Sequence, residues 1–122
     1  METLDKYLSA VQEADSSLPM LLSPPTWVAW RRLGEATKEC QEKCQGIKLA
    51  STKGLCIASC QADEAVKRIA MLRSALTACG RSKNPDKCRE KINEQIERWT
   101  EKLKLIRIRV AKLRVRAAKE RA

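Results

Sequence analysis

Apolar residues recur at intervals of three and four along most of the chain, which is the spacing of amphipathic helices. The most regular run starts at Cys88 and alternates steps of four and three as far as Ala117. Its other members are Ile92, Ile96, Trp99, Leu103, Ile106, Val110 and Leu113. The stretch "LKLIRIRV" also partly alternates like a strand, but the helical spacing continues on both sides of it. The pattern therefore predicts one long C-terminal helix with a heptad-like apolar face.

A second helix is predicted to begin after Ser23 and to run to about Gln45. Serine is a favoured N-cap, and the prolines that follow it suit the first helical turn, where a missing N–H group has no consequence. Gly46 then marks the end of the helix. The apolar face of this helix carries Trp27, Trp30, Leu33, Thr37, Cys40 and Cys44.

A third helix is predicted between the loop "GIKLASTKG" and Gly80, with Ser51 or Thr52 as its N-cap. Its apolar face carries Cys56, Cys60, Val66, Ile69, Leu72, Leu76 and Cys79. The following turn, "GRSKNP", offers Asn84 as the N-cap of the last helix and Pro85 as its first residue.

The overall prediction is an all-α protein with three segments. Phenylalanine is absent, and only four glycines and four prolines interrupt the chain, so long helices built from small and aliphatic residues are favoured. Leu4, Tyr7, Leu8 and Val11 predict a short N-terminal helix from about Thr3 to Ala14. The segments are an N-terminal helix and linker at 1–22, a helical hairpin at 23–80 and the long helix at 81–122.

The N-terminal residues do not resemble a targeting segment. Acidic residues outnumber the one lysine in "METLDKYLSAVQEAD", and the apolar run of a secretory signal is missing. The longest uncharged stretch, Ser16 to Trp30, contains three prolines and is too short to cross a bilayer. We therefore expect neither a cleaved presequence nor a transmembrane segment.

Four of the six cysteines form two pairs with a spacing of four residues, Cys40 with Cys44 and Cys56 with Cys60. Residues four apart share one helix face. In an antiparallel hairpin the numbers of facing residues have a constant total, and the nested pairing Cys40–Cys60 with Cys44–Cys56 satisfies this for both bonds. Crossed bonds, or bonds within one pair, fit the geometry less well. A zinc site and reduced core thiols stay open as alternatives.

The last two cysteines, Cys79 and Cys88, lie at the end of the third predicted helix and in the first turn of the fourth. A bond between them would fasten this turn, and the sequence leaves open whether it forms. Each disulfide would stabilise a small chain by roughly 2–4 kcal/mol.

The absence of histidine removes the commonest general base and metal ligand. Glycine-rich phosphate loops, nucleophile elbows and clustered carboxylates are also missing from the sequence. We therefore expect no catalytic residue, no cofactor and no bound metal, and hence a protein that is not an enzyme.

The twin C-x3-C arrangement of Cys40/Cys44 and Cys56/Cys60 resembles that of the small Tim proteins of the mitochondrial intermembrane space. More broadly, it is similar to the disulfide-stapled helical hairpins that enter this compartment by oxidative trapping. The resemblance covers roughly 23–80 and implies the nested disulfides, an intermembrane-space location and import without a presequence. Small Tims are chaperones that form hexameric rings and carry hydrophobic precursors. The Cys79/Cys88 pair and the long C-terminal helix depart from that pattern.

Most of the positive charge lies in the C-terminal helix. From Lys102 to the C-terminus there are nine basic residues and one acid, which gives +8 of the formal net charge of +10. If the turn at Cys79 and Cys88 folds this helix back along the third one, Ala111 lies opposite Cys56, and the basic residues beyond it overhang the hairpin. The residues predicted to contact partners are Trp99, Leu103, Ile106, Val110, Leu113, Lys112, Arg114, Arg116, Lys119 and Arg121.

The sequence leaves open whether this helix is a solvated basic face with an ordinary internal apolar seam or a docking surface, and the predicted overhang favours docking. Three kinds of partner surface would suit docking: acidic protein subunits, anionic lipid headgroups and RNA. Aromatic residues that would stack on bases are missing from the basic segment, so protein or lipid is favoured over nucleic acid. The sequence predicts a non-catalytic accessory subunit of a large inner-membrane assembly, such as a respiratory-chain complex or the ATP synthase, on its intermembrane-space side. A small Tim-like chaperone is the alternative, and an RNA-contacting subunit of the mitochondrial ribosome is the third.

Overall fold

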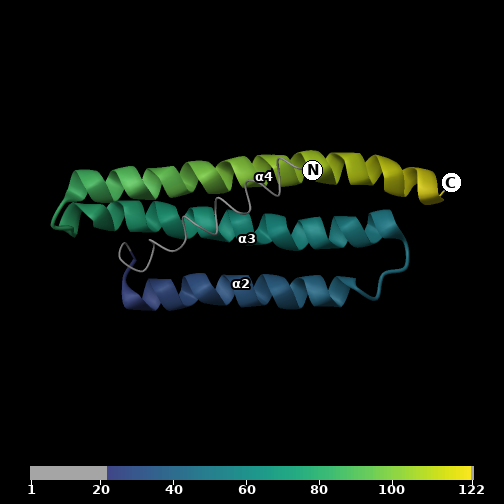
Figure 1. Ribbon diagram of the computed structural model, residues 1–122, viewed down its shortest axis with the longest axis horizontal. Coiled ribbons are helices and arrows are strands. Elements are labelled where there is room, and N and C mark those ends of the chain that lie inside the picture. Colours follow the sequence, from purple (N-terminus) through teal and green to yellow (C-terminus); the bar gives the residue numbers. More distant parts are fainter. Residues whose placement is uncertain (1–21, 122) are drawn as a thin grey trace.

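Three long helices lie side by side and antiparallel in the structure, which is a computed structural model (Figure 1). The structure describes residues 22–121. The middle helix, α3, packs against both of the others, and the backbones of the outer two do not meet. The elements are α2 at Pro24–Cys44, α3 at Ala50–Ala78, a short 3-10 helix η2 at Cys79–Arg81 and α4 at Pro85–Arg121.

The all-α prediction is confirmed, because the part of the chain that the structure describes contains helices and no strand. The stretch "LKLIRIRV" lies in the middle of α4, as the longer helical spacing predicted. The expected helix from about Thr3 to Ala14 lies outside the described residues. None of the helices within 22–121 combines the length and apolar content that crossing a membrane requires.

α2 begins and ends where the sequence predicted. Ser23 is the N-cap, with extended backbone angles, and Pro24 is the first helical residue. The Ser23 hydroxyl makes no capping hydrogen bond with the helix and instead shares a hydrogen bond of 2.7 Å with the Thr26 hydroxyl. Its carbonyl accepts the first helical hydrogen bond, from the Trp27 amide. Proline and the extended Ser23 backbone therefore set the start of this helix without a side-chain cap.

The predicted cap of α3 is wrong. Leu49 is the N-cap, so Ser51 and Thr52 lie within the first helical turn. The hydroxyl of Ser51 donates a 2.8 Å hydrogen bond to the Glu120 carboxylate near the end of α4, and Ser51 is buried. This serine joins α3 to α4 instead of capping its own helix.

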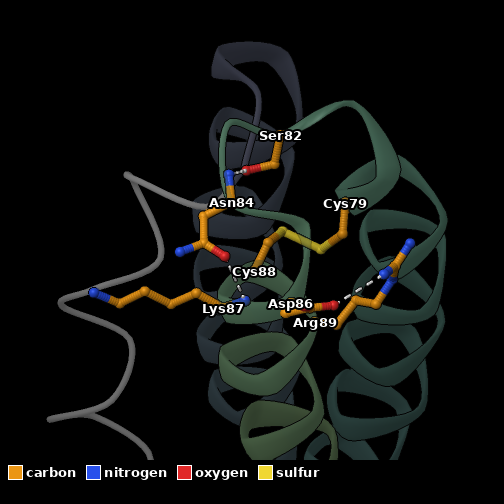
Figure 2. A network of polar contacts seen from close by, with 7 residues as sticks. All are labelled: Cys79, Ser82, Asn84, Asp86, Lys87, Cys88 and Arg89. Atoms are coloured by element: carbon orange, nitrogen blue, oxygen red, sulfur yellow. Dashed lines mark hydrogen bonds and ion pairs between the residues drawn. A yellow bond between two sulfur atoms is a disulfide. The ribbon is translucent and has the colours of Figure 1, made fainter.

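The turn between α3 and α4 follows the prediction closely (Figure 2). The Asn84 side-chain oxygen accepts a hydrogen bond of 3.2 Å from the Lys87 amide, which is the N-cap interaction expected before Pro85. The Asn84 amide in turn donates to the Ser82 hydroxyl at 3.3 Å. Polar side chains therefore satisfy the backbone of this turn while its ends stay close together.

The main core lies between the three helices near the α3–α4 turn. Its fully covered side chains include Leu72 of α3, Ile92 of α4 and Trp30 of α2. A smaller cluster forms farther along α3 and α4, where Ala58 packs with Ile106. Val66 was predicted on the inner face of α3 but is 49% exposed, whereas Arg68 is 5% exposed and takes part in the packing.

Candidate functional site

Two neighbouring disulfides, Cys40–Cys60 and Cys44–Cys56, fasten α2 to α3. We call this pair the disulfide ladder. The Cα atoms lie 5.8 Å apart in the first bond and 5.7 Å in the second, within the range that a disulfide requires. The Sγ atoms of Cys44 and Cys60 approach to 3.9 Å, so the two bonds lie in contact. The predicted nested pairing is confirmed.

The ladder also brings sulfur atoms close enough to be considered as metal ligands. The Sγ atoms of Cys44, Cys56 and Cys60 all lie within 4.8 Å of one another. Zinc binds thiolates, and each of these sulfurs is already bonded to another sulfur. In this oxidised form the cluster is therefore a covalent link between helices.

The third disulfide, Cys79–Cys88, fastens α3 to α4 at their common turn (Figure 2). Its Cα atoms lie 5.6 Å apart, and the chain between them contains the 3-10 helix η2 and the Asn84 cap. Cys79 is almost fully covered by the main core. All six cysteines are thus paired, and each helix is covalently joined to its neighbour.

A second unusual feature is a pair of cationic side chains buried among tryptophans, which we call the cation cluster. The guanidinium of Arg68 lies 4.4 Å from the ring centroid of Trp30 and 5.1 Å from that of Trp99. The ammonium of Lys102 lies 4.3 Å from the Trp99 ring. The side chains of Arg68 and Lys102 are 7% and 6% exposed. Such contacts are strongest where water is excluded, so the rings stabilise charge inside the bundle.

One carboxylate, that of Glu64, serves both buried cations. Its oxygen lies 3.6 Å from Nε of Arg68 and 3.9 Å from Nζ of Lys102, and its side chain is 11% exposed. The two indole rings meet edge to face with centroids 5.9 Å apart. Residues from α2, α3 and α4 therefore join in one network, which fixes the outer helices relative to the central one.

Gly34 on α2 lies directly against the Arg68 guanidinium of the cation cluster. A Cβ atom at this position would lie 3.3 Å from Nη2 of Arg68. The guanidinium borders an open groove on α2 whose lining includes Trp27, Arg31 and Lys38. A Cβ atom here would require the end of the Arg68 side chain to shift by a few tenths of an ångström, so glycine suits this close approach of the guanidinium to α2.

Sequence reasoning missed this cluster because it assigned charged residues to the solvent. A signal was nevertheless present in the spacing. Arg68 lies three residues after buried Ala65 and four before buried Leu72. Lys102 likewise lies three residues after Trp99 and four before Ile106. A cation that lies three residues after one core position and four before the next shares their helix face, so it is expected to point into the bundle.

The apolar residues predicted to contact partners are mostly used within the chain. Trp99, Leu103 and Ile106 are at most 8% exposed, and Val110 and Leu113 are half-buried. Leu113 packs against Gly54 of α3, where an added Cβ would lie 3.2 Å from its Cδ1 atom. The inner face of α4 thus covers α3, and a partner role for these five residues stays a prediction.

The predicted overhang of α4 is wrong over most of its length. The facing of α3 and α4 is as expected, since Leu113 lies at Gly54. However, α3 begins at Ala50, six residues before Cys56, so it covers α4 farther than predicted. Ala117 is 4% exposed, and Glu120 still bonds to α3. The charged members of the predicted partner set, Lys112, Arg114, Arg116 and Lys119, are exposed; the side chain of Arg121 lies outside the description.

Comparisons with protein-family models, curated proteins and solved structures find no match for this chain. The structure itself shows a disulfide-stapled helical hairpin, to which α4 is added by a third disulfide.

Proposed function

We propose that this protein is a non-catalytic structural subunit of the mitochondrial intermembrane space, peripheral to the inner membrane. In this proposal it is an accessory subunit of a large inner-membrane assembly, such as a respiratory-chain complex or the ATP synthase. The observation that carries the proposal is the pairing of all six cysteines into links between adjacent helices. Such links persist in oxidising compartments and are reduced in the cytosol.

The spacing of the disulfide ladder supports the compartment, because it resembles the twin C-x3-C pattern of proteins trapped there by oxidation. The body that the disulfides fasten supports a structural role. Its three helices hold each other through covalent bonds and the cation cluster, so it presents fixed surfaces to a neighbour. The exposed basic residues of α4 suit an acidic protein surface.

The alternative is a small Tim-like chaperone for hydrophobic precursors. One observation favours it, a groove between the start of α2 and the α3–α4 turn. Its apolar lining includes Leu22, Pro25, Ala29, Met71 and Ala75. A chaperone of this kind would use an apolar groove to bind unfolded segments.

The test is the native size of the assembly that contains this protein. Mitochondria of the source organism are gently solubilised, fractionated on a gradient and analysed by protein mass spectrometry. Comigration with a respiratory complex or the ATP synthase is the expected result. A small soluble particle would support the chaperone instead, and comigration with ribosomal proteins would support the RNA-contacting alternative. Absence from mitochondria would overturn the proposed compartment.

A further inference from the structure

α4 carries a second apolar stripe on the side that faces away from α3. Ile108 is 45% exposed and Val115 is 57% exposed, and Ala111 and Ala118 between and after them are also exposed. These four residues follow one another at steps of three, four and three. We call them the outer stripe. Since each residue turns the helix by about 100°, Ile108 lies on nearly the opposite side from buried Ile106.

The outer stripe has the spacing of the interface positions of a coiled coil. In heptad terms Ile108 and Val115 occupy a positions, and Ala111 and Ala118 occupy d positions. Within residues 22–121 this side is open, because α4 is an outer helix of the row and contacts α3 on its other side (Figure 1). A helix with small d residues lets the backbone of a second helix approach closely.

The flanks of the outer stripe are entirely basic. Arg107 and Arg114 occupy the g positions before each apolar step, and Lys112 and Lys119 occupy the e positions after it. All four side chains are exposed. The e and g residues face the charged flanks of the partner in a coiled coil and thereby select it. Four cations repel a second copy of the same stripe and attract a helix with carboxylates at these positions.

We propose that the outer stripe docks an acidic amphipathic helix of a partner protein, with Asp or Glu on both sides of a narrow apolar seam. This inference deepens the structural role proposed above and rests on it, because it names the chemistry of the neighbouring subunit. It places the proposed contact on the outer face of α4, away from the apolar residues of its inner face.

Two other anionic surfaces fit the outer stripe less well. Helices that lie on membranes insert bulky Trp, Phe or Leu side chains, whereas this stripe offers only Ile108 and Val115 as large apolar groups. Single-stranded RNA is bound by aromatic side chains that stack on bases, and the outer stripe contains none. A short apolar seam with basic flanks matches a helix of opposite charge.

The test uses the purified, oxidised full chain and a synthetic helical peptide of about three heptads, with Ile at a, Ala at d and Glu at e and g. A second peptide has Lys in place of every Glu. Binding is followed by fluorescence anisotropy at low and high salt. We expect the acidic peptide to bind and the basic one not to bind. The affinity should fall as salt rises, because exposed charges attract each other less under screening.

The variant I108Q/V115Q should lower the affinity for the acidic peptide by about tenfold or more, since it removes both large anchors of the seam. V66Q is the matched control, because Val66 is an equally exposed valine on α3. The affinity of the V66Q variant for the acidic peptide should equal that of the wild type. The variant R107E/K112E/R114E should reverse the preference and bind the basic peptide. Far-UV circular dichroism of each variant confirms that the helices persist.

Several results would overturn the proposal. Equal binding of both peptides would show that the contact is unspecific. A loss of affinity with V66Q as large as that with I108Q/V115Q would show the same. If anionic vesicles or poly(U) bind the chain through Ile108 and Val115 while the acidic peptide does not, the partner is lipid or RNA instead. Self-association that I108Q/V115Q abolishes would identify a second copy as the occupant. None of these assays needs mitochondria, so their failure is distinguishable from failure of the fractionation test.

Discussion

Replacement of Glu64 by Gln should destabilise the protein, and by more than replacement of Arg68 by Met. Glu64 is the carboxylate that Arg68 and Lys102 share inside the bundle. Glutamine keeps the size of the side chain and one acceptor oxygen but removes its charge. Two cations then remain close together at positions that are at most 5% exposed. Removal of a negative charge that lies beside two buried cations is costly.

The distances set the scale of this effect. At 3.6 Å and 3.9 Å, with an effective dielectric constant of about 20, each ion pair has an attraction of about 4 kcal/mol before desolvation is subtracted. Both separations are longer than in a tight charge-assisted hydrogen bond, which lowers the net value. Loss of one partner from a buried pair typically costs about 3–5 kcal/mol. We expect E64Q to lower the free energy of unfolding by about 3 kcal/mol, near the lower end of this range.

Replacement of Arg68 by Met should be milder, because it leaves Glu64 and Lys102 as a neutral pair. The lost contacts with Trp30 and Trp99 are worth about 1–2 kcal/mol together. In the R68M background, E64Q leaves a single buried cation and should cost about 2 kcal/mol less than in the wild type. The coupling energy between the two changes would therefore exceed the small deviation from additivity that independent sites show.

The assay is urea denaturation of the oxidised protein, followed by far-UV circular dichroism for the wild type, E64Q, R68M and the double variant. E97Q, at an exposed position of α4, is the matched control and should stay within about 0.5 kcal/mol of the wild type. A cost below about 1 kcal/mol for E64Q, or additive effects in the double variant, would refute the reasoning that this carboxylate neutralises both cations.

Two further predictions concern the α3–α4 turn. Substitution C79S/C88S should lower the free energy of unfolding by about 2–3 kcal/mol, because the lost bond closes a segment of 9 residues. Urea denaturation measures this change, and peptide mapping checks that the disulfide ladder is intact. An unchanged denaturation midpoint would contradict the prediction. Substitution N84A should lower the free energy of unfolding by about 1 kcal/mol, because the Lys87 amide loses its cap. The same assay is applied to K83A, a change at an exposed neighbouring position. Equal effects of the two substitutions would argue against the cap.

The helices and disulfides of this protein follow from short-range rules, which is why the sequence predicts them well. Spacing by four residues places Cys40 and Cys44 on one face of α2, and antiparallel facing then determines their partners. The start of α4 follows equally from Asn84 and Pro85, whose preference for helix ends is local. Both predictions needed no knowledge of tertiary packing, and both are confirmed.

The errors arise where packing overrides local preference. Ser51 has the chemistry of a cap, but it is drawn into α3 because its hydroxyl has Glu120 as a partner 69 residues away. Val66, which was expected on the inner face of α3, is exposed, and Arg68 is buried instead, because two tryptophan rings and Glu64 make the inside of the bundle favourable for a cation. The predicted overhang of α4 failed for a simpler reason, since it was counted from Cys56, whereas α3 extends back to Ala50 and covers more of α4.

The covalent links and the charge distribution are related through stability. A formal net charge of +10 on a small bundle opposes compaction by self-repulsion. Inside, Glu64 and the tryptophan rings compensate the buried cations, but the basic flanks of the outer stripe keep their charge at the surface. Disulfides stabilise by restricting the unfolded chain, and this contribution needs no neutralisation of the flanks. The fold can therefore keep a basic face exposed until an acidic helix covers it, which is the arrangement that selective docking requires.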